Sequence, residues 1–173
     1  MRVVCVGCRQ PGSLTIYVDI NIVEAMSRVP AVSFATTLYV RDCCLCLHVQ
    51  RAARALARRF DEALRPFGLT NGQFSLLMSL NRPEPATIAS VTNVLAMDRT
   101  TLTAALKPLH RRGLVKVAQD TADRRGRLLS LTAKGTKLLA SATPIWEQTH
   151  RAMEAQLTDI DPDRLRNSLR SLA

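Results

Sequence analysis

Residues 98–132 read DRTTLTAALKPLHRRGLVKVAQDTADRRGRLLSLT. Asp98 stands where a helix N-cap is expected and Gly113 where a helix stops, so residues 99–112 are predicted to form one helix. Two short apolar segments follow, and the residues between them, 119–127, are polar and charged, which predicts two strands joined by a long hairpin loop. A helix followed by a charged hairpin is therefore expected in this part of the chain.

Two further short helices are predicted before this segment. Thr70 can cap a helix that carries Phe74 and ends before the prolines at 83 and 85, and another short helix is expected over residues 87–95. Short helices in tandem, followed by a charged hairpin, are the order of a winged helix-turn-helix, in which a recognition helix enters the major groove and the hairpin reaches the minor groove. The expected fold is mainly α with a small β-hairpin wing.

Longer helices are predicted on both sides of this core. Apolar residues recur at three- and four-residue steps from Leu45 to Leu64, with arginines between them, which indicates one amphipathic helix from about residue 40 to 66. Thr132 can cap a second long helix, bent at Pro144, and a last helix is expected near the C-terminus. Residues 1–38 show little helical periodicity and are interpreted as an N-terminal arm.

The charge of the chain favours a polyanionic partner. Its 173 residues include 24 Lys and Arg against 14 Asp and Glu, a formal net charge of +10. Residues 99–127, about one-sixth of the chain, hold eight of the basic residues and two acidic ones. The seven aromatic residues are too few to provide stacking platforms for single-stranded bases. Duplex DNA is therefore the expected partner.

Several other classes are disfavoured by composition. No run of about 18 apolar residues occurs, so no membrane span is predicted. The five cysteines are odd in number and fall in two clumps, unlike a secreted disulfide framework, which favours the cytoplasm. Catalytic pairs and Gly-rich phosphate loops are absent from the sequence, so neither an enzyme nor a cofactor is expected.

The motifs of this region resemble those of the MarR (multiple antibiotic resistance regulator) family. The hairpin has a Gly-Leu-Val entry and the pattern Asp-x-x-Asp-x-Arg at residues 120–125, and Leu-Thr-x-x-Gly at residues 131–135 opens the next helix. Residues 99–103 and 109–113 resemble the recognition helix of the family, and Gly-Leu-Thr at 68–70 resembles the entry to its preceding helix. Several motifs in the same order and spacing make the resemblance specific.

The resemblance covers about residues 43–157 and implies a homodimeric transcription factor, usually a repressor released by a small molecule or an oxidant. It places one MarR-type domain at residues 39–173, with the winged helix-turn-helix at about 69–132 and dimerisation helices at about 40–66 and 133–173. Twofold symmetry predicts a pseudo-palindromic operator with half-sites about 10 base pairs apart. An apolar series at the end of the chain also favours a dimer, since one small domain cannot bury it: Leu157, Ile160, Leu165, Leu169 and Leu172.

Carried over by position, the resemblance implies a set of DNA contacts on the recognition helix. The three threonines are expected in the groove and the two cations on phosphates: Thr100, Thr101 and Thr103, with Arg99 and Lys107. Pro108 departs from the family pattern. It is expected to bend the second half of the helix, which argues against direct base contacts by Arg111 or Arg112.

The wing is expected to contribute a second set of contacts. Arg125 matches the wing arginine of the family, and a narrow minor groove rich in A·T pairs attracts such a side chain. Arg124 beside it adds a further cation to the DNA-binding set. Asp123 is interpreted as the ion-pair partner that orients Arg125 rather than as a catalytic group.

Cys46 resembles the first-helix cysteine of the organic-hydroperoxide-sensing branch of the family. Tyrosines of that branch hydrogen-bond the thiolate, whereas the corresponding positions here are Gln50 and Phe60. Packing of a small apolar side chain is one interpretation of Cys46, and redox sensing with Cys43 or Cys44 as the resolving partner is the other. Cys44 is the less suited partner, because residues two apart point to different sides of a helix.

Other interpretations of the sequence remain open. Cys5 and Cys8 form a CxxC pair that would need two more ligands to hold zinc, so a thiol-redox or zinc-binding protein with incidental basic charge is one alternative. A non-specific architectural DNA-binding protein is the other. A group of large apolar residues fits either plain core or a pocket for a small-molecule effector: Phe60, Phe74, Met78 and Trp146.

Overall fold

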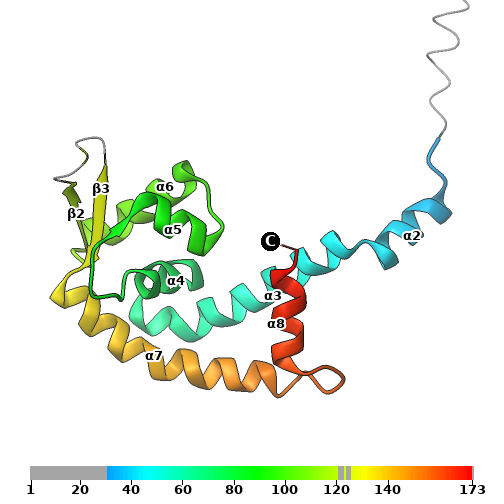
Figure 1. The fold of residues 1–173 in the computed structure, drawn as a ribbon. Helices are drawn as coiled ribbons and strands as arrows, with labels where there is room; N and C mark the ends of the chain where they lie inside the picture. Colours follow the sequence, from blue (N-terminus) through cyan, green and yellow to red (C-terminus); the bar gives the residue numbers. More distant parts are fainter. Residues whose placement is uncertain (1–30, 121–122, 124–125, 173) are drawn as a thin grey trace, which may run out of the picture. The chain divides into compact units, whose positions relative to one another are not determined.

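The computed structural model describes residues 31–120, 123 and 126–172 (Figure 1). The chain forms two units, of which the first ends at Leu47 and the second begins at His48. The first unit contains α2 (Phe34–Cys43) and the first turn of α3 (Leu45–Leu64). Helix α2 lies partly within the predicted arm, and the side chain of Ser33 caps it by accepting the N–H of Thr36 at 3.1 Å.

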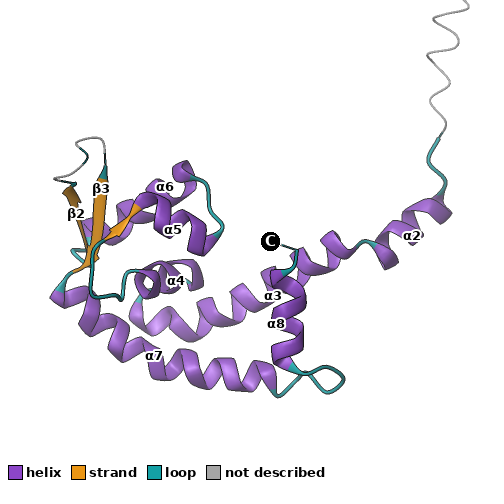
Figure 2. Ribbon diagram, viewed as in Figure 1, coloured by secondary structure: helices purple, strands orange, loops and turns teal. Residues whose placement is uncertain are grey.

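The second unit has the predicted order of short helices, hairpin and long helix. After α3 its elements are η1 (Arg65–Phe67), α4 (Asn71–Ser79), β1 (Ala86–Thr87), α5 (Ile88–Leu95), α6 (Arg99–Arg111), β2 (Val115–Gln119), β3 (Arg127–Leu131), α7 (Ala133–Glu154) and α8 (Pro162–Arg170). Figure 2 shows the β2–β3 hairpin at one end of the group formed by α4, α5 and α6, with α7 starting at the base of the hairpin. In the part of the chain that the structure describes, no helix is long and apolar enough to cross a membrane.

Side-chain caps fix where the helices of this unit begin. Thr70 accepts the N–H of Gln73 at 3.3 Å while the Gln73 amide oxygen accepts the N–H of Thr70 at 3.2 Å, a complete capping box at the start of α4. Thr87, Asp98 and Thr132 cap α5, α6 and α7 in the same position. Each of these starts agrees with the sequence because a cap depends only on residues within one turn.

The sheet contains one strand more than the sequence predicts. Strand β3 pairs antiparallel with β2 from Gln119↔Arg127 to Val115↔Leu131, as expected for the hairpin. On its other side β3 pairs with β1, where Ala86 lies opposite Leu129 and Thr87 opposite Leu128. A two-residue strand is too short to produce an alternating pattern, so only the pairing with β3 defines it.

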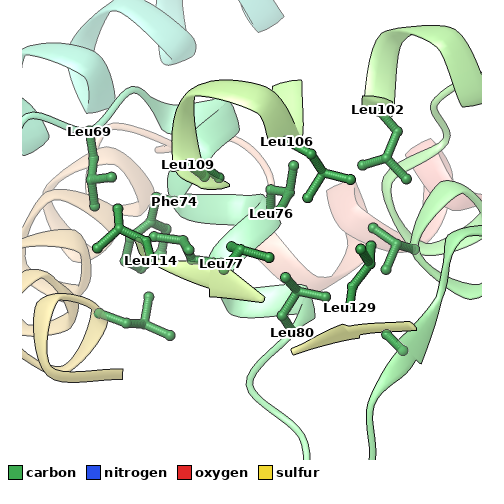
Figure 3. Close-up of a cluster of buried hydrophobic side chains, with 14 of the residues drawn as sticks. Leu69, Phe74, Leu76, Leu77, Leu80, Leu102, Leu106, Leu109, Leu114 and Leu129 are labelled. Carbon is green, nitrogen blue, oxygen red and sulfur yellow. The ribbon is translucent and has the colours of Figure 1, made fainter. Parts of the chain in front are cut away.

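A leucine-rich core holds the helices and the sheet together (Figure 3). Leu77 of α4, Leu102 and Leu109 of α6, and Leu129 of β3 are completely buried, and Leu114 joins them just before β2. Burying such a side chain contributes roughly 1.5–3 kcal/mol. The leucine side of α6 therefore packs into the core, and the opposite side of the helix faces outward.

Two prolines do not end the helices that contain them. Helix α6 continues through Pro108 to Arg111, and α7 continues through Pro144 to Glu154. The one helix predicted from residue 40 is instead divided at Cys44, whose backbone is extended with φ −74° and ψ 102°. No helix breaker occurs at this point of the sequence, since Cys44 lies between residues that all permit a helix.

Candidate nucleic-acid interface

The start of α6 is held by a tight cap. The carboxylate of Asp98 accepts the backbone N–H of Thr101 at 2.8 Å and the Thr101 hydroxyl at 2.6 Å. The hydroxyl bond first, and then the N–H bond, hold the pKa of Asp98 below its usual value, so the cap stays charged at neutral pH. The contribution of this cap to the stability of the folded protein is lost only as the pH falls through the lowered pKa of Asp98.

The three threonines predicted to face the groove differ in their hydrogen bonds. Thr101 donates its hydroxyl to Asp98, and Thr103 donates its hydroxyl to the carbonyl of Arg99 at 2.7 Å. Thr100 is exposed, and its hydroxyl bonds to none of the described residues. Thr100 therefore offers a free donor to a base or phosphate, while Thr101 and Thr103 offer mainly their methyl groups and lone pairs.

The outward face of α6 is defined by what the helix buries. At 100° per residue, the side opposite the buried Leu102, Leu106 and Leu109 carries four exposed residues: Thr100, Ala104, Lys107 and Arg111. The bend expected at Pro108 is the argument against base contact by Arg111. Since α6 runs unbroken to Arg111, that side chain lies on the same stripe as Thr100 and Lys107.

Arg112 has a different role from Arg111. Its guanidinium donates to the carbonyl of Gly68 at 2.6 Å and to that of Phe67 at 3.2 Å, which ties the end of α6 to the turn before α4. Gly68 adopts φ +61°, a conformation that glycine accepts without strain. The ammonium of Lys134 in turn donates to the carbonyl of Arg112 at 2.9 Å. These bonds from Arg112 and Lys134 are called the α6 end clamp below.

The wing is described only in part. Gly126 donates its N–H to the carbonyl of Asp123 at 2.8 Å, and Asp120 donates its N–H to the carbonyl of Gly126 at 3.2 Å, which closes the loop between β2 and β3. Arg124 and Arg125 lie outside the described residues, so their contacts with DNA, and the orienting role of Asp123, stay predictions.

The strands of the wing continue the basic surface. Lys116 on β2 and Arg127 on β3 are exposed, as are Arg99 and Lys107 on α6. Among the described residues, none of these four cations forms an ion pair. Their charge is therefore not neutralised within the protein and is available to phosphates.

Comparison with known proteins agrees with this geometry. A family model described as a winged helix DNA-binding domain matches residues 69–135. The crystal structure of the M. tuberculosis transcriptional regulator MosR in complex with DNA is 37% identical, with a TM-score of 0.68 over 75% of this chain and 92% of that chain. A mutant MarR from E. coli complexed with operator DNA shares the fold, with a TM-score of 0.70 and 24% identity over 78% of this chain and 97% of that one.

The chain belongs to the MarR family. A further relative, the organic hydroperoxide resistance transcriptional regulator of Bacillus subtilis, is 29% identical over 101 residues, which are 58% of this MarR-family chain and 69% of that protein. The segment that aligns with the regulator YwoH of the same species, at 33% identity, spans 64% of YwoH. The predicted family and the predicted winged-helix fold are confirmed.

The three cysteines near the start of α3 are arranged differently from the prediction. Cys43 ends α2, Cys44 lies between the helices, and Cys46 lies in the first turn of α3; Cys43 and Cys46 are exposed. The sulfur of Cys44 accepts the N–H of Leu47 at 3.5 Å, which caps α3. Because Cys44 is not in a helix with Cys46, the argument that disfavoured it as a partner of Cys46 is wrong.

No zinc site is formed by the described residues. Among them, no group of three or more His, Cys, Asp or Glu side chains is placed to hold a metal ion. Cys5 and Cys8 lie outside the described residues, so the CxxC pair has no structural test.

An aromatic stack joins α3, α4 and α7 in this MarR-family protein. The ring of Trp146 on α7 lies 5.8 Å from that of Phe74, 6.2 Å from that of Phe60 and 4.8 Å from that of His150. A cavity of about 350 Å³ opens beside Trp146, between α4 and α5. Of the four residues for which the sequence left plain core and pocket lining open, Phe74, Met78 and Trp146 line this cavity, whereas Phe60 is buried in the stack.

Proposed function

We propose that this MarR-family protein binds one operator in duplex DNA as a homodimer and regulates transcription there, as a repressor rather than as an enzyme. The outward face of α6 carries the proposal, because it presents Thr100, Lys107 and Arg111 together opposite the buried leucines. In this proposal α6 enters the major groove and the wing arginines, Arg124 and Arg125, reach the flanking minor groove. No cofactor takes part.

The residues of this face are expected to divide into two kinds of contact. Lys107 and Arg111 bind phosphates, which fixes the register of the protein on DNA without reading the sequence. Thr100 lies near the N-terminal end of α6, the end that reaches base edges in helix-turn-helix proteins, and contributes to sequence readout. The two kinds differ in their dependence on salt and on sequence.

Replacing Lys107 or Arg111 by alanine is expected to weaken binding of operator and random DNA alike, and to lower the salt slope by about 1 for each residue. The slope falls because one phosphate contact releases about one counterion fewer. Fluorescence anisotropy at several salt concentrations measures it, with an operator obtained by selecting bound fragments from genomic DNA. Arg151→Ala, which removes an exposed cation of α7, is the control and should leave the slope unchanged.

Thr100→Ala has the complementary expectation, a smaller ratio of operator to random-DNA affinity with an unchanged salt slope. The wild-type ratio also separates the proposal from an architectural role. A regulator should prefer its operator by about 1000-fold or more. If the wild type binds random DNA as tightly as the operator, the architectural function is the correct one. If it shows no salt-dependent binding of duplex DNA at all, the thiol-redox or zinc alternative is favoured.

We infer further that an oxidant is one signal that releases DNA, through Cys46. Its exposure allows access to a hydroperoxide, and Cys44 lies two residues away outside the helix. The Cys46 thiolate attacks the terminal oxygen of the hydroperoxide, giving a sulfenic acid while the alkoxide leaves and takes up a proton as the alcohol. Condensation with the Cys44 or Cys43 thiol then forms a disulfide and releases water. A disulfide to Cys44 removes the sulfur that caps α3.

Cys46→Ser is expected to bind operator normally but to stay bound when an organic hydroperoxide is added, whereas the wild type dissociates and rebinds after reduction. Cys44→Ser and Cys43→Ser identify the resolving thiol, because the variant that lacks it stops at the sulfenic acid, which dimedone traps. The packing interpretation makes the opposite prediction: neither the wild type nor the variant responds to the hydroperoxide, and dimedone labels neither protein.

The cavity beside Trp146 offers a second route of release by a small apolar molecule. Val94 and Leu95 of α5 form one wall and Trp146 of α7 another, so a ligand there contacts both the helix before α6 and the long helix. A volume of about 350 Å³ suits a small aromatic compound. Quenching of Trp146, the single tryptophan, reports such a ligand directly.

A further inference from the structure

A second cavity lies at the other end of the winged helix, beside the α6 end clamp. It measures about 370 Å³ and opens between the end of α6, the start of β2 and the first turns of α7. Its lining combines three cations with two leucines and one hydroxyl: Arg112, Lys134, Lys137, Leu114, Leu138 and Ser141. It shares no lining residue with the cavity beside Trp146.

The charge of this cavity is uncompensated. None of the described residues that line it is acidic, and none of its three cations forms an ion pair with any described residue. The ammonium of Lys137 is exposed and has no hydrogen-bond partner among the described residues. Three like charges around one small cavity repel one another, and an anion between them removes that repulsion. More than one negative charge is needed to balance them.

The floor of the cavity is apolar. Leu114 is only 1% exposed and Leu138 is half-buried, and both belong to the leucine core or pack against it. An inorganic anion would leave these side chains against water, whereas an organic anion with a small apolar group would cover them. The volume is within the range of small-molecule sites.

Two of the three cations also hold α6 in place. Lys134 donates to the carbonyl of Arg112 at 2.9 Å, and Arg112 donates to the carbonyls of Gly68 and Phe67. A bond from a cation to an anionic oxygen is stronger than one to a neutral carbonyl, so an anion in the cavity draws both side chains away from these carbonyls. The ligand would therefore loosen the end of the helix that carries Lys107 and Arg111.

We propose that this cavity binds a small organic dianion, a phosphate monoester or dicarboxylate with an apolar group, and that the ligand weakens DNA binding by opening the α6 end clamp. Binding of the dianion is independent of the function proposed above, whereas its effect on DNA rests on that function. By reciprocity, DNA must weaken binding of the dianion by the same factor.

Phenyl phosphate is a suitable probe, since its charge near pH 7 is close to −2 and its ring is small. Its affinity for the full chain without DNA is measured by calorimetric titration. The wild type should bind phenyl phosphate about tenfold more tightly than inorganic phosphate, which lacks the ring, and about tenfold more tightly than phenol, which lacks the charge. Lys137→Ala should lower the affinity for phenyl phosphate about tenfold at an unchanged melting temperature. Arg151→Ala removes an exposed cation of α7 outside the cavity and should bind phenyl phosphate like the wild type.

The effect on DNA is measured with the operator at constant ionic strength. Saturating phenyl phosphate should weaken operator binding about fivefold or more in the wild type. Lys134→Met, which lacks the clamp ammonium, should bind the operator more weakly than the wild type and show no further loss on adding phenyl phosphate. Lys137→Ala should bind the operator like the wild type when phenyl phosphate is absent.

Three results would overturn the proposal. Equal affinity of wild type and Lys137→Ala for phenyl phosphate places the ligand elsewhere. A lower salt slope for operator binding by Lys137→Ala without ligand means that the cavity holds a phosphate of the DNA backbone instead. Binding of phenyl phosphate with no change in operator affinity removes the regulatory role of the cavity. A wild type that fails to bind any operator contradicts the proposed function but leaves the calorimetric test of the cavity intact.

Discussion

Replacing Gly135 by alanine is expected to lower the free energy of unfolding by about 3 kcal/mol. Gly135 lies in the first turn of α7, and a Cβ atom at this position would lie 2.1 Å from the carbonyl oxygen of Leu114. That oxygen cannot move away cheaply, because it accepts the N–H of Thr132 at 3.0 Å and belongs to backbone at the start of β2. Thermal and urea unfolding of the variant measure the loss.

Gly72→Ala is the matched control for this prediction. Gly72 also lies in the first turn of a helix, α4, but no atom lies within 4 Å of the Cβ that alanine would add. Alanine is the better helix former, so this change should stabilise the protein by about 0.5 kcal/mol. If Gly135→Ala leaves the free energy of unfolding unchanged or raises it, as Gly72→Ala is expected to do, then α7 can shift away from β2 and the prediction is wrong.

The cap at the start of α7 shows why one part of the fold was predictable from sequence. Within the pattern Leu-Thr-x-x-Gly, Thr132 accepts the N–H of Gly135 at 3.0 Å, and this bond is confined to one turn. The contact of Gly135 with the backbone of Leu114, in contrast, is long-range and cannot be recognised from the pattern alone. The caps at Thr70 and Asp98 are equally local, which is why the helix starts agree with the prediction. Signals confined to one turn survive in the sequence alone.

Features that depend on distant residues were not predictable. Strand β1 exists only because β3 lies beside it, and Arg112 reaches a carbonyl 44 residues away at Gly68. Lys134 cannot be distinguished by sequence from a solvated lysine, yet it caps the end of α6. The place of Arg111 on the outward face of α6 could not be assigned from the sequence either, since Pro108 leaves the course of the second half of the helix open; in the structure the helix continues through Pro108, with Leu106 and Leu109 on either side of it buried.

Removing α8 is expected to abolish the dimer and to weaken operator binding by about 100-fold or more. The change is a stop codon after Gln156, which keeps Trp146 and its ring contacts and also keeps the hydrogen bond from Arg59 to Gln156 at 2.7 Å. Helix α8 has no buried residue, so its loss costs the winged helix little. The side chains of Leu169 and Leu172 are 42% and 63% exposed, and we expect the second protomer to cover them.

The expected loss of affinity follows from the linkage of two half-sites. A dimer that has bound one half-site holds its second α6 near the other, so the second binding event is intramolecular and adds a factor of roughly 10²–10⁴. A monomer lacks that factor but keeps the contacts of a single α6, so its affinity for an isolated half-site should equal that of the full chain. Sedimentation equilibrium gives the oligomeric state, and anisotropy with whole and half operators gives both affinities.

Point variants separate loss of the interface from loss of the chain end. Leu169→Lys keeps α8 and places a charge on its exposed apolar side, so it should also yield a monomer. Arg164→Ala, an exposed change on the same helix, should remain dimeric. The ion pair of Arg166 with Glu154 still holds α8 to the end of α7 in both variants. If the chain that ends at Gln156 is a soluble dimer with full operator affinity, α8 is not the interface, and the exposed apolar residues of α2 and α3, such as Tyr39 and Leu45, become the surface to test.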